Sequence, residues 1–132
     1  MIVLDASAAV ELLIGRSRAA ASVAAVLRNE LPRVPVHFDA EVFGAIRGLT
    51  QRREIIIDDA LAALFRLRTL RLQRVAIVPL VAEAFAVRDR FAAYDAFYAI
   101  VARLSSATLV TCDRGLARAA DGYCQVDFVA LT

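Results

Sequence analysis

Short apolar runs alternate with longer helix-like segments along the whole chain, and this alternation restricts the fold more than any other feature. Each run is too apolar to leave one face in water, so we expect strands that are buried on both sides. Apolar residues at helical spacing occupy the intervals between the runs. Strands that alternate with helices are typical of a mostly parallel central sheet flanked by helices on both faces. The sequence therefore predicts one α/β domain, residues 1–132, without a repeat or linker.

The turn and capping residues give approximate boundaries for these elements. Gly15 is expected to end the first helix, and Ser17 and Asp39 are expected to cap the helices that follow them. The predicted strands are residues 2–4, 34–38, 74–78, 107–112 and 126–131. The predicted helices are residues 6–14, 18–30, 40–53, 60–72, about 79–90, 94–106 and 114–120.

The chain is unusually apolar, with 60% hydrophobic residues and a mean hydropathy of +0.59. Pro79 and Glu83 nevertheless interrupt the most apolar stretch, which is too short to cross a bilayer. Asp5 and Glu11 break the N-terminal apolar run, so no signal peptide is expected. These features predict a cytoplasmic protein with no membrane contact. The excess apolar surface favours a partner subunit or a second protein.

All sixteen basic residues are arginine, and the net charge is only +2. A coding bias toward arginine and alanine also produces this composition, and bulk charge does not indicate a nucleic-acid-binding protein. Any phosphate contact must use guanidinium groups, which bind phosphate in a bidentate manner. Arg47, Arg52, Arg53 and Arg114 are candidates for such contacts, with simple solvation as the alternative. Mechanisms that require a lysine are excluded.

The cysteines and the histidine do not indicate a metal centre. Cys112 and Cys124 have no partner at zinc spacing and are expected to be reduced. His37 is the only histidine, and we expect it in a loop or on the surface.

Four carboxylates follow the predicted strands or begin the predicted helices. Asp5 and Asp113 come directly after strands, Asp95 lies at a helix N-terminus, and Glu41 lies in a first helical turn. Ligands of open α/β sheets bind beyond the carboxyl ends of the strands, so the four side chains are expected at one edge. Each aspartate could instead cap its helix, and Glu41 could complement a helix dipole. The remaining aspartates are expected as solvated or capping residues: Asp39, Asp58, Asp59, Asp89, Asp121 and Asp127.

Convergence of these carboxylates would require a cation. Their mutual repulsion in a partly dry cleft would otherwise raise some of their pKa values strongly. Oxygen ligands without Cys or His favour Mg²⁺, with Mn²⁺ as a substitute. Such an ion can activate water and bind a phosphate oxygen, which suits cleavage of a phosphodiester.

Four blocks of the sequence, taken in order, resemble the signature blocks of PIN-domain proteins: "MIVLDASAAVELL", "AEVFGAIRGL", "YDAFYAIVA" and "LVTCDRGLA". Within that family the chain looks most like VapC-type toxins of bacterial type II toxin–antitoxin pairs. The resemblance covers essentially the whole chain. It implies that Asp5, Glu41, Asp95 and Asp113 form a catalytic, metal-binding quartet.

The same resemblance implies that Ser7 and Thr111 support the quartet, although local backbone hydrogen bonds would explain both hydroxyls equally well. It further implies a Mg²⁺-dependent endoribonuclease that cuts a tRNA or ribosomal RNA. A homodimer and inhibition by a cognate VapB-like antitoxin are also implied. Arg114 and Gly115 stand where some relatives carry another acidic residue. The sequence therefore leaves open whether a second metal ion binds.

Other families explain the carboxylates less well. A phosphoacceptor receiver domain needs paired acids and a lysine, and a haloacid-dehalogenase-type phosphatase needs an acid where Ser7 stands. The remaining alternative is a catalytically silent PIN-like module that only binds protein or RNA. Four mutually repelling carboxylates argue against it, since a pure binding module does not need them.

Overall fold

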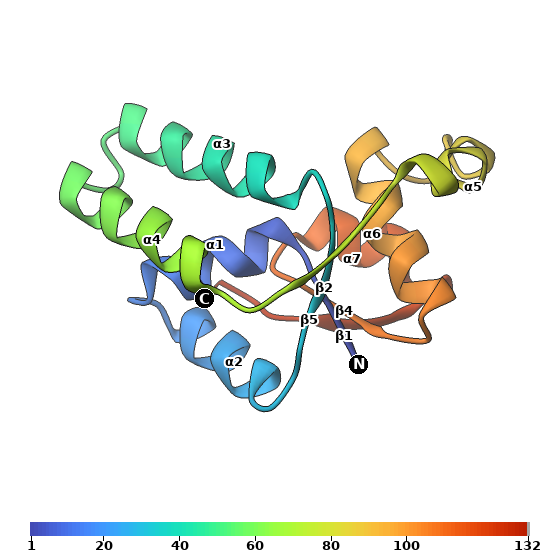
Figure 1. The fold of residues 1–132 in the computed structure, drawn as a ribbon, viewed down its shortest axis with the longest axis horizontal. Coiled ribbons are helices and arrows are strands. Elements are labelled where there is room, and N and C mark those ends of the chain that lie inside the picture. The colour runs from blue at the N-terminus through green and yellow to red at the C-terminus, as the bar shows by residue number, and fades with distance from the viewer. Residues whose placement is uncertain (132) are drawn as a thin grey trace.

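A five-stranded, entirely parallel sheet forms the centre of the computed structural model, which describes residues 1–131 (Figure 1). The strands are β1 (Ile2–Leu4), β2 (Arg33–Pro35), β3 (Gln73–Val75), β4 (Thr108–Thr111) and β5 (Gln125–Phe128). The α-helices are α1 (Ala6–Ile14), α2 (Arg18–Leu27), α3 (Phe38–Gln51), α4 (Ile57–Thr69), α5 (Val81–Ala86), α6 (Ala93–Leu104) and α7 (Arg114–Ala120). A short 3-10 turn, η1 (Val78–Leu80), precedes α5. The predicted α/β class is confirmed.

The strand order is β3-β2-β1-β4-β5, so the sheet grows in two directions from its centre. The first half of the chain builds β1, β2 and β3 outward on one side, and the second half adds β4 and β5 on the other. In Figure 1, α1 to α4 lie to one side of the strands, and α5 and α6 lie to the other. The boundary between β1 and β4 is therefore the topological switch point of the sheet, where ligands of such folds usually bind.

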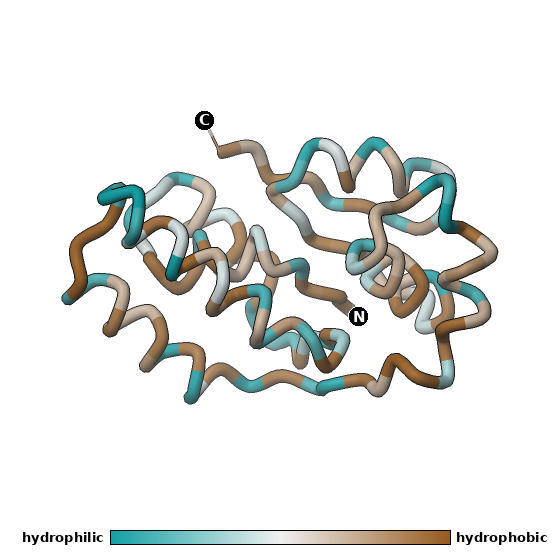
Figure 2. Tube along the Cα trace, turned by 90° about the horizontal axis from the view of Figure 1, so that it is seen from above, coloured by the Kyte–Doolittle hydropathy of each residue, from teal (hydrophilic) through white to brown (hydrophobic). Residues whose placement is uncertain are grey.

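The central strands are buried because apolar helices cover both of their faces. Val3, Leu4, Leu109 and Val110 are fully buried, as expected for strands without a solvent-facing side. In Figure 2 the hydrophobic segment that leads from the N-terminus lies in the interior of the tube trace. Register pairs Val3 with Leu109. No helix within residues 1–131 is long and apolar enough to cross a lipid bilayer.

Several predicted boundaries are wrong because tertiary contacts override local signals. The predicted strand 34–38 ends at Pro35, and α3 already begins at Phe38, whose side chain is fully buried in the core. His37 therefore occupies the N-cap position instead of Asp39. Asp39 forms a bidentate ion pair with Arg74 of β3, with N–O distances of 2.7 and 2.8 Å.

The other boundaries shift by a few residues. Helix α4 begins three residues before the predicted start, and the predicted helix 79–90 consists of η1 and the short α5. Gly15 does end α1, in the left-handed conformation with φ of 76°, and Ser17 caps α2 by accepting from the amide of Ala20. Both cysteines are free thiols, as predicted. Burial raises the pKa of the Cys112 thiol to about 11, which makes it a poor nucleophile.

Candidate functional site

The switch point between β1 and β4 places the two strand-end aspartates next to each other. Asp5 follows β1, and its backbone amide donates to the carbonyl of Val110 at 3.0 Å, which extends the pairing with β4 by one residue. Asp113 follows β4 two residues after Thr111. Two parallel strands that end at the same level thus bring residues 108 positions apart to one edge of the sheet.

Asp5 is almost fully buried, with 5% of its surface exposed, and two hydroxyls hold its side chain. Ser7 and Thr111 both donate to Oδ2 of Asp5, at 2.5 and 2.8 Å. The hydroxyls in turn accept from the amides of Cys112 and Asp113, at 3.0 and 2.9 Å. The structure therefore places both Ser7 and Thr111 against Asp5. The bond between Thr111 and the Asp113 amide is a local backbone hydrogen bond, whereas the bond between Ser7 and the Cys112 amide joins residues 105 positions apart.

The structure shows for each of the three aspartates whether its side chain caps a helix, and the result differs between them. Asp5 stands at the N-cap position of α1, but its side chain makes no capping hydrogen bond there. Asp95 lies inside the first turn of α6, whose N-cap is Ala92. Asp113 does cap α7, with Oδ1 accepting from the amide of Leu116 at 3.1 Å.

The pKa of Asp95 indicates that the four carboxylates lie within range of one another's charge. Burial, together with the charges of Asp5, Asp113 and Glu41, raises the pKa of Asp95 to about 6. Burial also raises the pKa of Asp5, and the charge of Asp113 adds to this shift while the hydroxyls of Ser7 and Thr111 oppose it. Asp95 can sense the other three charges only if they lie nearby. The charges of the four carboxylates therefore influence one another, while their assignment as one metal site stays a prediction.

Glu41 lies in the first turn of α3 and reaches the cluster from the β2 side of the sheet. Its side chain is 27% exposed, and its Oε1 accepts from the hydroxyl of Tyr98 at 2.8 Å. Nε2 of His37 lies 3.3 Å from the same oxygen. Glu41 is thus oriented by groups from α3 and α6, and its position in a first turn agrees with the prediction.

Two residues at this site were not predicted as part of it. The side chain of His37 is only 17% exposed, and both ring nitrogens are buried without a hydrogen bond. His37 lies in the turn between β2 and α3, so the expected loop position is confirmed and the alternative surface position is wrong. Its ring packs against Tyr94, Phe97 and Tyr98, with centroid distances of 5.6, 5.7 and 5.4 Å. Tyr98 follows Asp95 by three residues, a spacing that places both on one helix face. That spacing is the only sequence signal for it, and a buried core tyrosine shows the same signal.

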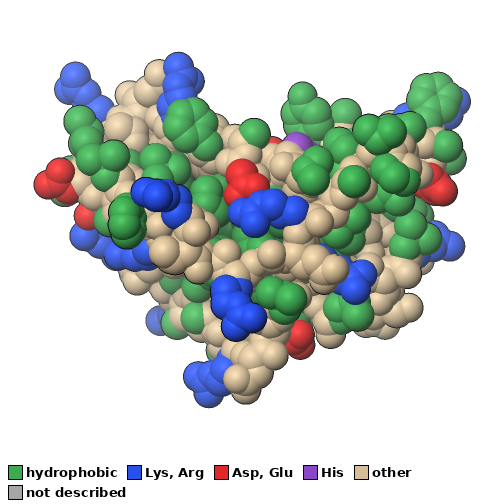
Figure 3. Space-filling view, in the orientation of Figure 1, with side chains coloured by type: hydrophobic (Ala, Val, Ile, Leu, Met, Phe, Trp, Pro, Cys, Tyr) green, Lys and Arg blue, Asp and Glu red, His purple; other side chains and the backbone are tan. Residues whose placement is uncertain are grey.

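Arginine does not compensate the negative charge of these carboxylates. Among residues 1–131, no arginine forms an ion pair with any of the four carboxylates, although the chain contains sixteen arginines. In Figure 3 the histidine appears, in purple, in the depression between two raised shoulders of the molecule. Arg52 is paired with Glu54 at 3.0 Å, and the guanidinium of Arg114 lies 5.0 Å from the centre of the Phe128 ring. Arg47 and Arg53 are exposed.

The donor set suits a hard divalent cation in an open site. In the hydrogen bonds of residues 1–131, Asp5 uses only Oδ2, Glu41 only Oε1 and Asp113 only Oδ1. One oxygen of each carboxylate is therefore free to bind a ligand. Among these residues, no group of three or more His, Cys, Asp or Glu side chains is arranged so that it could hold a metal ion. Mg²⁺ does not require one, because it usually keeps several waters and binds through one or two carboxylates.

Comparisons with known proteins show which sequences the chain is similar to. The family model described as "PIN domain" matches residues 2–122. The chain is 37% identical over 130 residues to "Ribonuclease VapC12" of Mycobacterium tuberculosis, an alignment that covers 98% of this chain and 100% of that protein. It is 36% identical over 118 residues to "Ribonuclease VapC3" of the same species, covering 89% and 86% of the two chains. It is 33% identical over 129 residues to "VapC ribonuclease Mb0985" of Mycobacterium bovis, covering 98% of each.

Proposed function

The chain belongs to the PIN domain family, and from this premise we propose that it is a metal-dependent endoribonuclease, the toxin of a toxin–antitoxin pair. The names of its relatives from M. tuberculosis and M. bovis support ribonuclease activity, since these proteins align with nearly the whole chain. The site supports a hydrolytic reaction on a phosphodiester. The observation that carries the proposal is the group of four uncompensated carboxylates at the switch point of the sheet.

Asp5, Glu41, Asp95 and Asp113 would hold a Mg²⁺ ion, with Mn²⁺ as a substitute. A folded protein gains nothing from gathering four anionic groups whose charges disfavour one another, so the arrangement indicates a cationic ligand. A bound ion supplies an activated water and binds a phosphate oxygen during in-line displacement. Ser7 and Thr111 support this role, because they fix Oδ2 of Asp5 and leave Oδ1 directed away from their hydroxyls.

The RNA backbone would approach across the depression in which the histidine appears in Figure 3, because His37 lies beside Glu41. Because these groups repel phosphate, binding needs cations at the rim of the depression. Arg52 and Arg114 supply guanidinium groups that are not used against the quartet, and Arg47 and Arg53 lie exposed near the end of α3. A tRNA or ribosomal RNA is the substrate class that we expect.

The apolar surface supports a homodimer and an antitoxin as partners. Helix α4 exposes Ile57, Leu61 and Phe65 at four-residue spacing, so the three side chains share one face. Figure 2 shows hydrophobic residues recurring along the edge of the molecule that contains α4. Phe85 of α5 is also exposed. Sedimentation equilibrium of the protein without its antitoxin should give twice the chain mass of 14.3 kDa, and a monomer would contradict the dimer.

The decisive experiment measures cleavage of total tRNA and ribosomal RNA by the purified protein with Mg²⁺ or with EDTA. Asp5→Asn keeps the shape of the side chain and removes its charge, so we expect at least a hundredfold loss of activity, on the order of that for other essential catalytic groups. Asp89→Asn, at an exposed position outside the site, is the matched control and should cleave like the original protein.

Cleavage that persists in EDTA and in Asp5→Asn would reject the proposed metal site. A protein that binds Mn²⁺ but cleaves no RNA would favour the catalytically silent binding module instead.

A further inference from the structure

Tyr98 is a fully buried phenol with a charged hydrogen-bond partner. None of its surface is exposed, and its hydroxyl donates to Oε1 of Glu41 at 2.8 Å. Tyr94, on the same helix, is 64% exposed. A hydroxyl buried in an apolar core is unfavourable unless it is hydrogen-bonded. The Tyr98 hydroxyl is therefore satisfied by Glu41. The apolar packing around the ring would not by itself offset the burial of this hydroxyl.

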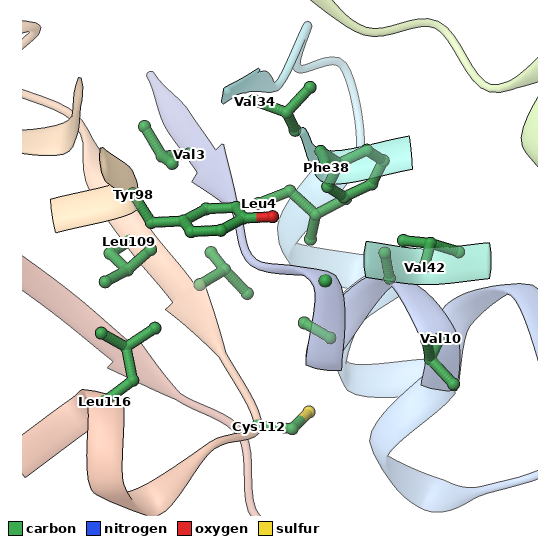
Figure 4. Packing of buried hydrophobic residues seen from close by; sticks show 14 of the residues in the cluster. Val3, Leu4, Val10, Val34, Phe38, Val42, Tyr98, Leu109, Cys112 and Leu116 are labelled. Atoms are coloured by element: carbon green, nitrogen blue, oxygen red, sulfur yellow. The ribbon is translucent and has the colours of Figure 1, made fainter. Parts of the chain in front are cut away.

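The surroundings of Tyr98 restrict the direction of its hydroxyl. In Figure 4 the ring extends from α6 past Leu4 of β1, and its oxygen is directed toward the start of α3 near Phe38. His37 packs edge-on against the ring, with a centroid distance of 5.4 Å and an interplanar angle of 80°. Since a closely packed core side chain stays in one rotamer, the donor presented to Glu41 has a fixed position.

The hydrogen bond also selects one orientation of the Glu41 carboxylate. A glutamate side chain that is 27% exposed on a helix would otherwise sample several rotamers. With Oε1 held by Tyr98, Oε2 remains free for a ligand. Burial and the bond to Glu41 raise the pKa of Tyr98, so the phenol keeps its proton and remains a donor at neutral pH.

We infer that Tyr98 is a positioning residue, which holds the Glu41 carboxylate in the orientation needed to bind the catalytic metal ion. The inference rests on the proposed function and assigns a role to a residue outside the acidic quartet. Helix α6 would then contribute to the site in two ways. Asp95 would bind the metal directly, and Tyr98 would orient Glu41 of α3. Groups that orient metal ligands typically improve metal affinity or activity by about 10–100-fold.

The test measures Mn²⁺ binding by electron paramagnetic resonance, with the metal alone and no RNA. Four proteins are compared: the original chain, Tyr98→Phe, Glu41→Gln and the double variant. We expect Tyr98→Phe to weaken Mn²⁺ binding about tenfold while its circular dichroism spectrum stays unchanged. In the Glu41→Gln background, Tyr98→Phe should have no further effect, because Tyr98 acts through that carboxylate. Tyr94→Phe is the matched control and should bind Mn²⁺ like the original chain.

Three outcomes would overturn the inference. Tyr98→Phe that binds Mn²⁺ normally would show that the hydrogen bond does not matter for the metal. Equal losses on adding Tyr98→Phe to the original chain and to Glu41→Gln would assign the effect to the fold rather than to Glu41. An original chain that binds no Mn²⁺ would reject both this inference and the metal part of the proposed function. Coupled losses in a protein that cleaves no RNA would instead support the positioning role and reject only the nuclease.

Discussion

Thr111 shows how a single residue connects the fold to the candidate site. Its side chain is fully buried, donates to Asp5 and accepts from the amide of Asp113. One hydroxyl therefore joins the residues that follow β1 and β4. A valine has almost the same shape but can do neither, so it would leave the buried Asp5 carboxylate with the Ser7 hydroxyl alone and the Asp113 amide without a partner.

We predict that Thr111→Val lowers the free energy of unfolding by about 1–3 kcal/mol, the range for leaving buried polar groups unsatisfied. Urea denaturation without added metal measures this difference. Thr69→Val is the control, since the hydroxyl of Thr69 donates to the carbonyl of Arg66 at an exposed position, and its loss should cost less than about 0.5 kcal/mol. Similar losses in the two variants would mean that the contact with Asp5 contributes little.

At the scale of elements, α3 carries two glycines in its interior, where glycine is the least favourable residue after proline. A Cβ atom at Gly44 would meet no atom within 4 Å, so internal packing does not require glycine there. At Gly48 a Cβ would lie 2.9 Å from Nη1 of Arg52, which covers that position. Both glycines border a cavity of about 270 Å³ that also contacts Ser7 and Glu11.

We predict that Gly44→Ala raises the free energy of unfolding by about 0.5–1 kcal/mol, because alanine loses less backbone entropy in a helix. Gly48→Ala should gain less, since the Arg52 side chain has to move away from its contact with Glu54. Urea denaturation of the two variants at low protein concentration compares them. A loss of stability in Gly44→Ala would contradict the view that internal packing leaves room for a side chain there.

At the scale of the whole molecule, the four carboxylates come from the ends of β1 and β4 and from the first turns of α3 and α6. The fold brings these charges together and must tolerate their repulsion. Because the folded-state pKa of Asp95 is raised to about 6, the stability that this group contributes is present at low pH and lost as the pH rises through about 6. In the metal-free protein, Asp95 should therefore contribute less to the free energy of unfolding at neutral pH than near pH 4.

We predict that Mg²⁺ raises the melting temperature at pH 7.5 and that EDTA reverses the shift. At a tenfold excess over its dissociation constant, the ion should add about 1.4 kcal/mol, or about 3–6 °C for a domain of this size. The shift should be smaller at pH 5, where protons compete with the metal for Asp95, and should be much reduced in Asp95→Asn. Differential scanning calorimetry measures it. An equal shift in Asp95→Asn would place the ion elsewhere.

Much of the candidate site could be predicted because it depends on chain direction and topology. In a parallel sheet all strands end at the same edge, so residues that follow strands meet there whatever the loops do. Asp5 and Asp113 were predicted on this basis, and their side-chain environment agrees. The contact of Tyr98 with Glu41 could not be predicted, since it joins two helices across 57 positions and depends on their packing.

Local signals failed where a tertiary contact was stronger. Asp39 has a high capping preference, worth about 1 kcal/mol, but α3 begins one residue earlier and Asp39 pairs with Arg74 instead. His37 has no apolar periodicity of its own, and only the approach of α6 buries its ring. The ion pair of Asp39 and the burial of His37 both depend on residues far away in the sequence, so neighbouring residues do not predict them.

The sequence by itself determined the α/β class, the alternation of elements and the identity of the acidic residues at the strand ends, because burial pattern and chain order are local properties. The tertiary structure alone decided which hydroxyl holds which carboxylate, that Asp5 is not a cap, and that His37 and Tyr98 adjoin Glu41. These contacts join residues far apart in the chain. Their geometry follows from how α3 and α6 pack at the switch point, where small displacements decide whether a hydrogen bond forms.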